Sequence, residues 1–359
     1  MARNGWKMTK ILTCTFAPTA MGGGPQLLLR SERPSGTVKQ PVRQPSGAVL
    51  RQQVGQPVLQ AEALGIDYLL IAQRWWGNGI DVESSTYDCL AMTGYYAAVT
   101  ERIRLITAIH PGFFSPAPIA KWGATIDRLT GGRWAVNVVS GWHMREFPMY
   151  GADMAGHDAR YDRSGEFIDI LRAAWNSPRF DYDGRYYQVK GLELQPRPVQ
   201  EQLEVFQGGQ SDAAMAMAAE RSDWMFLNGG PPEKIGRIIE EVRARTKRTG
   251  RKVRFALHTI GMCRRTDAEA EAEIAARVAA IDPKIAEARR AHVTGAQGMW
   301  AETDDKLARI DTNEGYASRL IGSPDTILRR MNEFHLLGVD MFLVTLHDPL
   351  FNSEVLPAL

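Results

Sequence analysis

The residues with the clearest chemical potential follow a short apolar run at 134–139. Asn137 lies near the end of this run, and Ser140, Gly141 and Trp142 come next. An amide and a hydroxyl can each donate and accept hydrogen bonds, and a glycine lets the backbone turn close to a ligand. The stretch is therefore a candidate binding edge. A capped turn with a packed Trp142 explains the same residues, and composition does not separate the two interpretations.

His157, Arg160 and Tyr161 fall within one turn at the start of an expected helix. Asp158 can cap this helix, and His157 and Tyr161 are spaced to share a face. The free N–H groups of a helix start, with Arg and Tyr nearby, form a reasonable phosphate pocket. The simpler interpretation is an ordinary polar helix start.

A second candidate anion site is the turn at 207–212, which joins an apolar run to a helix. It contains Gly209, Gln210 and Ser211. Small residues leave backbone N–H groups available to an anion, and the serine hydroxyl adds a donor. An ordinary turn with a serine cap is the alternative.

The candidate catalytic groups are titratable side chains near such loops: Arg74, His110, His143 and Arg319. Trp75 and Trp76 follow Arg74 and could wall an apolar pocket. A histidine can serve as a base or a donor, whereas an arginine can stabilise an anion. A purely structural role is the competing interpretation for each of them.

Metal and nucleophile chemistry find no support in the sequence. Cys14, Cys89 and Cys263 lie far apart, and no metalloprotease, calcium-loop or nucleophile-elbow motif is present. We expect no metal site.

Eight apolar runs of the kind typical of buried strands must position these residues, with helical patterns between them. The runs cover 11–16, 67–71, 104–109, 134–139, 204–206, 224–227, 253–262 and 340–346. Alternating strands and helices indicate a parallel sheet, and the number eight favours a closed α/β barrel, a (β/α)8 TIM barrel. No dinucleotide-binding glycine motif follows the first run, which argues against an open nucleotide-binding sheet.

We expect one domain over 1–359, with insertions at the carboxyl ends of the strands. The segment 22–56 is rich in Gly, Pro, Ser, Gln and Arg and predicts a mobile basic loop. The segment 284–320, which contains glycines and Arg319, is a candidate lid. Barrel active sites are built from loops on this face.

Composition narrows the possible partners. The chain has 43 basic and 41 acidic residues, a balance that argues against nucleic-acid binding. We find neither a leader sequence nor an apolar stretch long enough to span a membrane, so the cytoplasm is the expected location.

The order of motifs resembles the bacterial luciferase-like family of flavin-dependent monooxygenases, nearest to the dimethylsulfone and alkanesulfonate monooxygenases and the pyrimidine oxygenase. The motifs are ATIDRLTGGR at 124–133, NVVSGW at 137–142, EF at 146–147, HDARY at 157–161, FQGGQSDA at 206–213, SDW at 222–224 and LIGSP at 320–324. Similarity extends from about residue 60 to the C-terminus.

The resemblance implies that the chain binds reduced FMN (FMNH2) and uses dioxygen to oxidise a small organic substrate. Its implied FMN-binding residues are Gln73, Arg74, Asn137, Glu146, Arg160, Tyr161 and Ser211, with Tyr161 and Ser211 at the phosphate. Ser140, His157, Gly209 and Gln210 join them from the patterns described above. A separate NAD(P)H:flavin reductase would deliver the flavin, and relatives suggest a homodimer or homotetramer.

The motifs that carry the resemblance do not specify one substrate. Carbon–sulfur cleavage of a sulfone or sulfonate is the leading expectation, and opening of a nitrogen heterocycle is an alternative. The loop residues Trp75, Trp76 and His143 and the segment 17–20 depart from the family pattern on the substrate side. The same barrel could also carry an FMN- or deazaflavin-dependent dehydrogenase, or a flavin-binding protein without catalysis.

Overall fold

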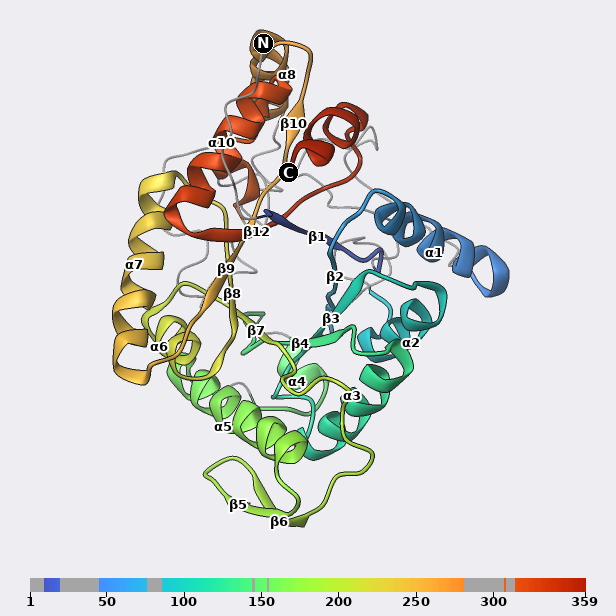
Figure 1. Ribbon diagram of the computed structural model, residues 1–359, viewed down its shortest axis with the longest axis vertical. Coiled ribbons are helices and arrows are strands. Elements are labelled where there is room, and N and C mark those ends of the chain that lie inside the picture. Colours follow the sequence, from blue (N-terminus) through green and yellow to red (C-terminus); the bar gives the residue numbers. More distant parts are fainter. Residues whose placement is uncertain are drawn as a thin grey trace.

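The computed structural model describes residues 10–19, 45–75, 86–143, 146–153, 155–280, 307 and 314–359. Its centre is a closed barrel of parallel strands in the order β1-β12-β9-β8-β7-β4-β3-β2 (Figure 1). The eight strands are β1 (Leu12–Phe16), β2 (Tyr68–Ile71), β3 (Arg104–Ile109), β4 (Trp134–Val138), β7 (Val205–Gly208), β8 (Trp224–Leu227), β9 (Arg254–His258) and β12 (Val339–Leu343). The predicted (β/α)8 barrel is confirmed.

Alternation along the strands divides the core into two layers. On β4, Ala135 belongs to the cluster inside the barrel, whereas Trp134 and Val136 belong to the layer between strands and helices. Successive side chains of a strand point to opposite faces. Once one residue of a strand is known to face the barrel interior, every second residue of that strand faces it too. Aromatic rings fill the interior; Phe206 and Trp224 stack with centroids 5.2 Å apart.

Helices surround the barrel, as Figure 1 shows. They are α1 (Gly47–Ala63), α2 (Cys89–Val99), α3 (Pro116–Thr130), α5 (His157–Asn176), α6 (Asp212–Arg221), α7 (Pro232–Thr249) and α10 (Pro324–Leu337). The apolar spacing in α5 buries Phe167, Ile168 and Leu171 against the strands. The α3 helix ends at Gly131, whose positive φ of 66° is the left-handed conformation that glycine adopts readily.

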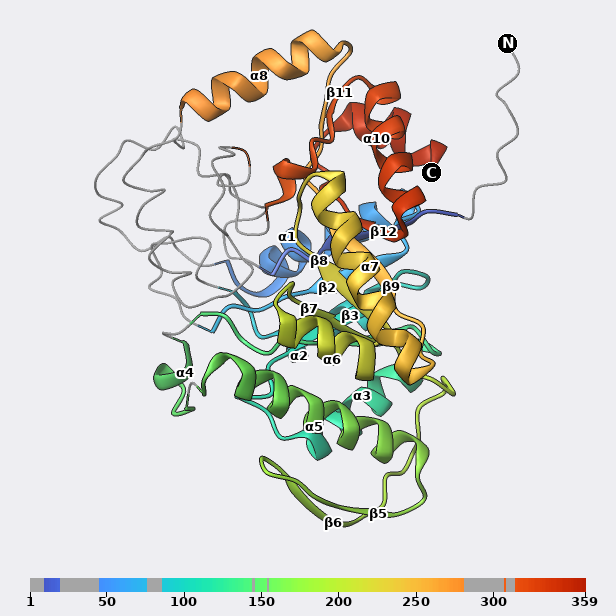
Figure 2. The ribbon, with the colours of Figure 1, turned by 90° about the vertical axis from the view of Figure 1, so that its left-hand side faces the viewer.

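Smaller elements decorate the barrel. They are α4 (Glu146–Met149), the hairpin β5 (Phe180–Asp183) and β6 (Gln188–Leu192), the pair β10 (Met262–Cys263) and β11 (Ile321–Gly322), α8 (Asp267–Ala279), η2 (Gly315–Ser318), η3 (Phe351–Val355) and η4 (Leu356–Ala358). Figure 2 shows the hairpin and α8 at opposite ends of the long axis. None of the helices in the described ranges is long and apolar enough to cross a bilayer.

Two of the expected segments have different boundaries in the structure. The basic loop predicted over 22–56 ends earlier, because α1 begins at Gly47 and packs Val54 and Val58 inward; residues 22–44 lie outside the described ranges. The run at 253–262 is not one strand, since β9 ends at His258 and Met262 pairs instead with Ile321.

The end of the predicted lid is fixed in place. Only 307 and 314–320 of the segment 284–320 are described. Tyr316 and Ala317 are buried, and the Ile260 N–H donates to the Gly315 carbonyl. This part of the segment therefore belongs to the packed body of the protein, beside the carboxyl end of β9.

Candidate active site

The carboxyl ends of the eight parallel strands form the mouth of the barrel, and Asn137 and His110 lie there. Side chains two or four residues apart along a strand point to the same face. Ala135 and Ile106 face the interior of the barrel, so Asn137, two residues after Ala135, and His110, four residues after Ile106, are directed the same way. Both polar side chains are buried. The Asn137 Oδ1 is also buried and has no hydrogen-bond partner among the described residues. Since a buried polar atom normally has a partner, this amide is suited to an incoming ligand.

His110 is held by an aromatic neighbour. The Trp75 indole N–H donates to His110 Nδ1 over 3.1 Å. Burial, aided by the positive charge of Arg74, lowers the pKa of His110 to about 3. The imidazole is therefore neutral at the pH of the cell.

Trp75 is also the centre of an aromatic wall beside the mouth. Its ring lies 4.5 Å from Phe113, 5.4 Å from Phe114 and 5.1 Å from Tyr150, measured between centroids. These four residues line a hollow of about 510 Å³, with polar groups such as Arg163 among its other walls. A hollow of this size and lining suits a small organic molecule.

Arg74 and His143 meet at Trp142. The Arg74 Cζ lies 4.7 Å above the Trp142 ring, which is cation–π geometry, and the His143 ring is 5.3 Å from the same indole. His143 is only 2% exposed. The structure thus brings together two of the predicted catalytic residues, from the loops after β2 and β4.

Glu146 ties these two loops to each other. Its Oε1 accepts a hydrogen bond of 2.8 Å from the backbone N–H of Trp75. Gly141 lies so close to Phe147 that an added Cβ would come within 2.6 Å of that ring, and its φ of 95° also requires glycine. The bend after β4 is therefore fixed by packing.

Arg160 holds the same bend from helix α5. Its Nε donates to the Gly141 carbonyl at 3.2 Å and its Nη1 to the Ala155 carbonyl at 2.8 Å. His157, one turn earlier, shares a hydrogen bond of 2.7 Å with Asp158, and its ring lies 5.1 Å from Tyr161. The predicted cluster at 157–161 is thus one connected surface.

Tyr161 meets the turn after β7 and forms a polar cradle there. Its hydroxyl lies beside Ser211, and burial raises its pKa. Ser211 caps α6 by accepting from the Ala214 N–H at 3.3 Å. At Gly209 a Cβ would come within 2.5 Å of the Tyr161 hydroxyl, so only glycine lets this hydroxyl lie so close to the turn. Two hydroxyls beside a helix start can hold a phosphate.

Three other predicted site residues form hydrogen bonds to neighbouring parts of the chain. The Gln73 Oε1 accepts from the backbone of Cys89 at the start of α2, and the Ser140 hydroxyl pairs with that of Ser164. Gln210 donates to the Asn228 carbonyl at 3.1 Å. Arg319 is exposed at the end of η2, and its backbone has a φ of 52°.

Sequence reasoning missed two polar residues at the mouth. His258 ends β9 and lies two residues after the inward Ala256, and its ring is 5.9 Å from Phe16. Thr345 lies two residues after the inward Leu343. Its Oγ1 is buried without a hydrogen-bond partner among the described residues. The alternation of inward and outward side chains along each strand is the sequence signal that could have identified both residues.

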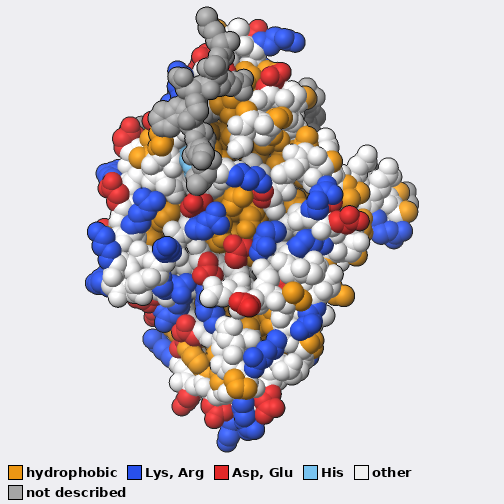
Figure 3. Space-filling model, in the orientation of Figure 1, with side chains coloured by type: hydrophobic (Ala, Val, Ile, Leu, Met, Phe, Trp, Pro, Cys, Tyr) orange, Lys and Arg blue, Asp and Glu red, His pale blue; other side chains and the backbone are white. Residues whose placement is uncertain are grey.

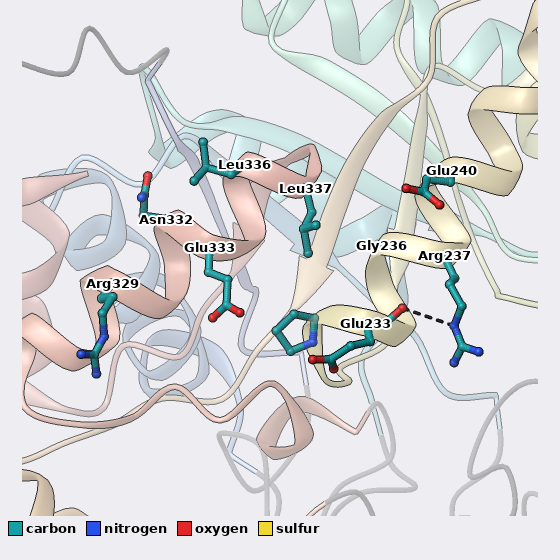
Figure 4. A pocket seen from close by; sticks show the side chains of 10 residues that line it. Glu233, Gly236, Arg237, Glu240, Arg329, Asn332, Glu333, Leu336 and Leu337 are labelled. Atoms are coloured by element: carbon teal, nitrogen blue, oxygen red, sulfur yellow. Dashed lines mark hydrogen bonds between the residues drawn. The ribbon is translucent and has the colours of Figure 1, made fainter.

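The larger surface hollow lies elsewhere. A groove of about 720 Å³ runs between α7 and α10 on the outside of the barrel, lined by residues such as Arg237 and Leu337 (Figure 4). Acidic and basic side chains intermingle over the face drawn in Figure 3. No cluster of metal-ligating side chains occurs within the described ranges.

Comparison with known proteins decides the family. Residues 35–341 match the family described as luciferase-like monooxygenase. The chain belongs to this family. It is 37% identical over 293 residues to an FMNH(2)-dependent dimethylsulfone monooxygenase of Pseudomonas putida, covering 79% of each chain. The predicted resemblance is therefore confirmed.

Solved structures share the same barrel. The riboflavin lyase RcaE superposes with a TM-score of 0.77 at 19% identity, covering 98% of this chain and 91% of the other. DmoA from Hyphomicrobium sulfonivorans gives a TM-score of 0.73 at 19% identity, covering 98% and 88%. At this identity the likeness concerns the fold alone.

The residues at the mouth fit a flavin mononucleotide. The unpartnered Asn137 Oδ1 and the Tyr161 and Ser211 hydroxyls beside Gly209 are the two features that a polar, phosphate-bearing ligand would complete.

Proposed function

We propose that this luciferase-like monooxygenase oxidises a small sulfone or related organosulfur compound and breaks its carbon–sulfur bond. The enzyme is an FMNH2-dependent monooxygenase. The observation that carries the substrate class is the 37% identity, over 79% of the chain, to a dimethylsulfone monooxygenase.

Reduced FMN, when bound, supplies the electrons that activate dioxygen. The chain's own residues bind, orient and exclude water. Tyr161 and Ser211 would hold the phosphate, and Asn137 would meet a polar edge of the flavin. The aromatic side chains around Trp75 supply an apolar wall of the neighbouring hollow, which would limit the access of water to a reactive oxygen species.

The mouth favours a small substrate without a positive charge. His110 is neutral, and Arg74 contributes the positive charge near it. In the proposed net reaction, one oxygen atom of dioxygen is inserted at the carbon next to sulfur and the other leaves as water. The oxygenated carbon then departs as an aldehyde, and the sulfur leaves as a sulfinate.

A separate NAD(P)H:flavin reductase would supply the reduced flavin. We also propose a homodimer or homotetramer. Apolar positions on α2 such as Tyr95, Tyr96 and Val99 could contact a partner, but Tyr96 is fully buried within the chain and the Tyr95 hydroxyl donates to the Arg51 carbonyl of α1. Val99 remains a candidate contact. Sedimentation at micromolar concentration tests the assembly, and a monomer alone would contradict it.

The function is tested by anaerobic titration with reduced FMN, followed by dioxygen and single substrates. We expect turnover with dimethylsulfone, release of one aldehyde and one sulfinate per dioxygen consumed, and no turnover without dioxygen. Alkanesulfonates and nitrogen heterocycles form the comparison set. Oxygen-independent turnover with a flavin or deazaflavin would favour the dehydrogenase interpretation, whereas tight flavin binding with no substrate turnover would favour a binding protein.

A further inference from the structure

The hydrogen bond between Trp75 and His110 defines which nitrogen of the histidine carries the proton. An indole N–H can only donate. Because it points to His110 Nδ1 over 3.1 Å, Nδ1 must be an unprotonated acceptor. A neutral imidazole with a bare Nδ1 has its proton on Nε2.

We infer that Trp75 is a positioning residue that holds His110 as an Nε2–H donor toward an oxygen acceptor of the bound substrate, so that His110 does not act as a base. The substrate part of this inference rests on the proposed function. The tautomer itself depends only on the geometry of the two side chains.

The indole is firmly placed to impose this tautomer. Its own backbone N–H is bonded to Glu146 Oε1 at 2.8 Å, and its ring packs against Phe113 and Tyr150. The indole and imidazole planes are nearly perpendicular, at 86°. An indole held by its backbone and by its aromatic neighbours keeps its place when the imidazole rotates.

The surroundings of His110 also oppose a second proton. The side chain is 5% exposed, its ring lies 6.0 Å from Phe113, and Arg74 is the charged group that acts on it. Apolar surroundings and a neighbouring positive charge both disfavour an imidazolium. The described residues give Nε2 no hydrogen-bond partner, so this donor is available to a ligand.

Nitrogen-15 NMR of histidine-labelled full-length protein tests the tautomer directly, without flavin or substrate. We expect the His110 resonances to show a proton on Nε2 and none on Nδ1. The variant Trp75→Phe keeps an aromatic ring but removes the N–H, and should shift His110 toward a mixture of tautomers. Circular dichroism would verify that the variant is folded.

The matched control is Trp175→Phe. It removes another buried indole hydrogen bond, from Nε1 to the Ala120 carbonyl at 3.1 Å, between α5 and α3. It should leave the His110 resonances unchanged. A wild-type His110 protonated on Nδ1, or on both nitrogens, would overturn the inference, as would an unchanged tautomer in Trp75→Phe.

Kinetics with dimethylsulfone, reduced FMN and dioxygen test the role of the donor. His110→Gln places an amide N–H near the Nε2 position, whereas the shorter side chain in His110→Asn reaches only about as far as Nδ1. We expect Gln to retain kcat within about threefold and Asn to lose about 10-fold, the size of a lost hydrogen bond to a neutral acceptor.

Neither amide can act as a base, so equal losses in Gln, Asn and Ala would indicate proton abstraction and overturn the inference. Should dimethylsulfone not be turned over even by the wild type, the proposed substrate fails while the NMR result still decides the tautomer.

Discussion

Two sets of polar side chains, one at each end of the barrel, differ in their hydrogen bonding. At the amino ends of the strands, Glu204 accepts hydrogen bonds from Tyr68 at 3.0 Å, from Trp224 at 2.8 Å and from Arg104 at 2.8 Å. At the carboxyl ends, Asn137 Oδ1 and Thr345 Oγ1 have no partner in the described part of the chain.

This difference suggests that the polar residues at the amino end stabilise the barrel, whereas those at the carboxyl end bind a ligand. A carboxylate bonded by three side chains from three strands stabilises the barrel, because the buried Tyr68 and Trp224 donors would otherwise lose this partner. An unsatisfied group at the mouth costs stability, and such a cost is typical of a site that a ligand completes. Variants at the two ends should therefore change different quantities.

The largest effect is expected from Glu204→Ala at the amino end. It removes three hydrogen bonds from a partly buried carboxylate, and we expect a loss of about 3 kcal/mol in the free energy of unfolding. Denaturant unfolding measures it. The control is Glu201→Ala, which changes an exposed neighbouring carboxylate and should stay within about 0.5 kcal/mol of the wild type. An equal loss in both variants, or weakened flavin binding by folded Glu204→Ala, would remove the distinction between the two ends.

Next come Tyr161→Phe and Ser211→Ala in the cradle. Each removes one hydroxyl that is expected to meet the phosphate, worth roughly 1.5–3 kcal/mol or about a 10- to 100-fold increase in the Kd for reduced FMN. Anaerobic titration measures it. Because Ser211 also caps α6, the control is Ser323→Ala, which removes the corresponding cap of α10. Both cap variants should lose about 1 kcal/mol of stability, but only Ser211→Ala should weaken flavin binding.

His110 predicts a pH effect on stability. Its pKa is lowered to about 3 in the folded chain, whereas an unfolded histidine titrates near ~6.5. Between these values the unfolded chain binds the extra proton, so stability falls as the pH decreases below about 6.5. The slope should exceed that of His110→Gln by up to about 1.4 kcal/mol per pH unit. Parallel unfolding curves for the two proteins from pH 7 to 5 would contradict the lowered pKa.

Much of the fold was predictable because each barrel strand is a short apolar run bounded by turns. The runs at 104–109 and 224–227 coincide with β3 and β8. The start of α1 was missed, since Gly47, Gly55 and Pro57 weaken the helical signal. Packing of Val54 and Val58 against the barrel outweighs these local preferences.

The candidate site was predictable where a polar residue ends a strand, as at Asn137 and His110. It was not predictable where the partner is distant in sequence. Trp75 and His110 are 35 residues apart, and only the closed barrel brings them together. For the same reason the sequence suggested a base or a donor for His110 without deciding between them, whereas the bond to Trp75 favours the donor.

The smallest expected effect compares two buried threonines. The Thr107 hydroxyl is paired with that of Thr93 at 2.8 Å and accepts from the Trp134 indole at 3.0 Å, whereas the Thr345 hydroxyl has no partner within the described ranges.

Valine has nearly the shape of threonine, so each replacement removes little except the hydroxyl. Thr107→Val should lower the free energy of unfolding by about 1 kcal/mol, because two partners lose a bond. Thr345→Val should raise it by about 0.5 kcal/mol, because an unsatisfied group is removed. Urea unfolding with equal m-values measures both. Changes of opposite sign in the free energy of unfolding would support the view that ligand-binding groups at the mouth lower stability. A loss of stability in both variants would mean that the Thr345 hydroxyl is hydrogen-bonded within the folded chain.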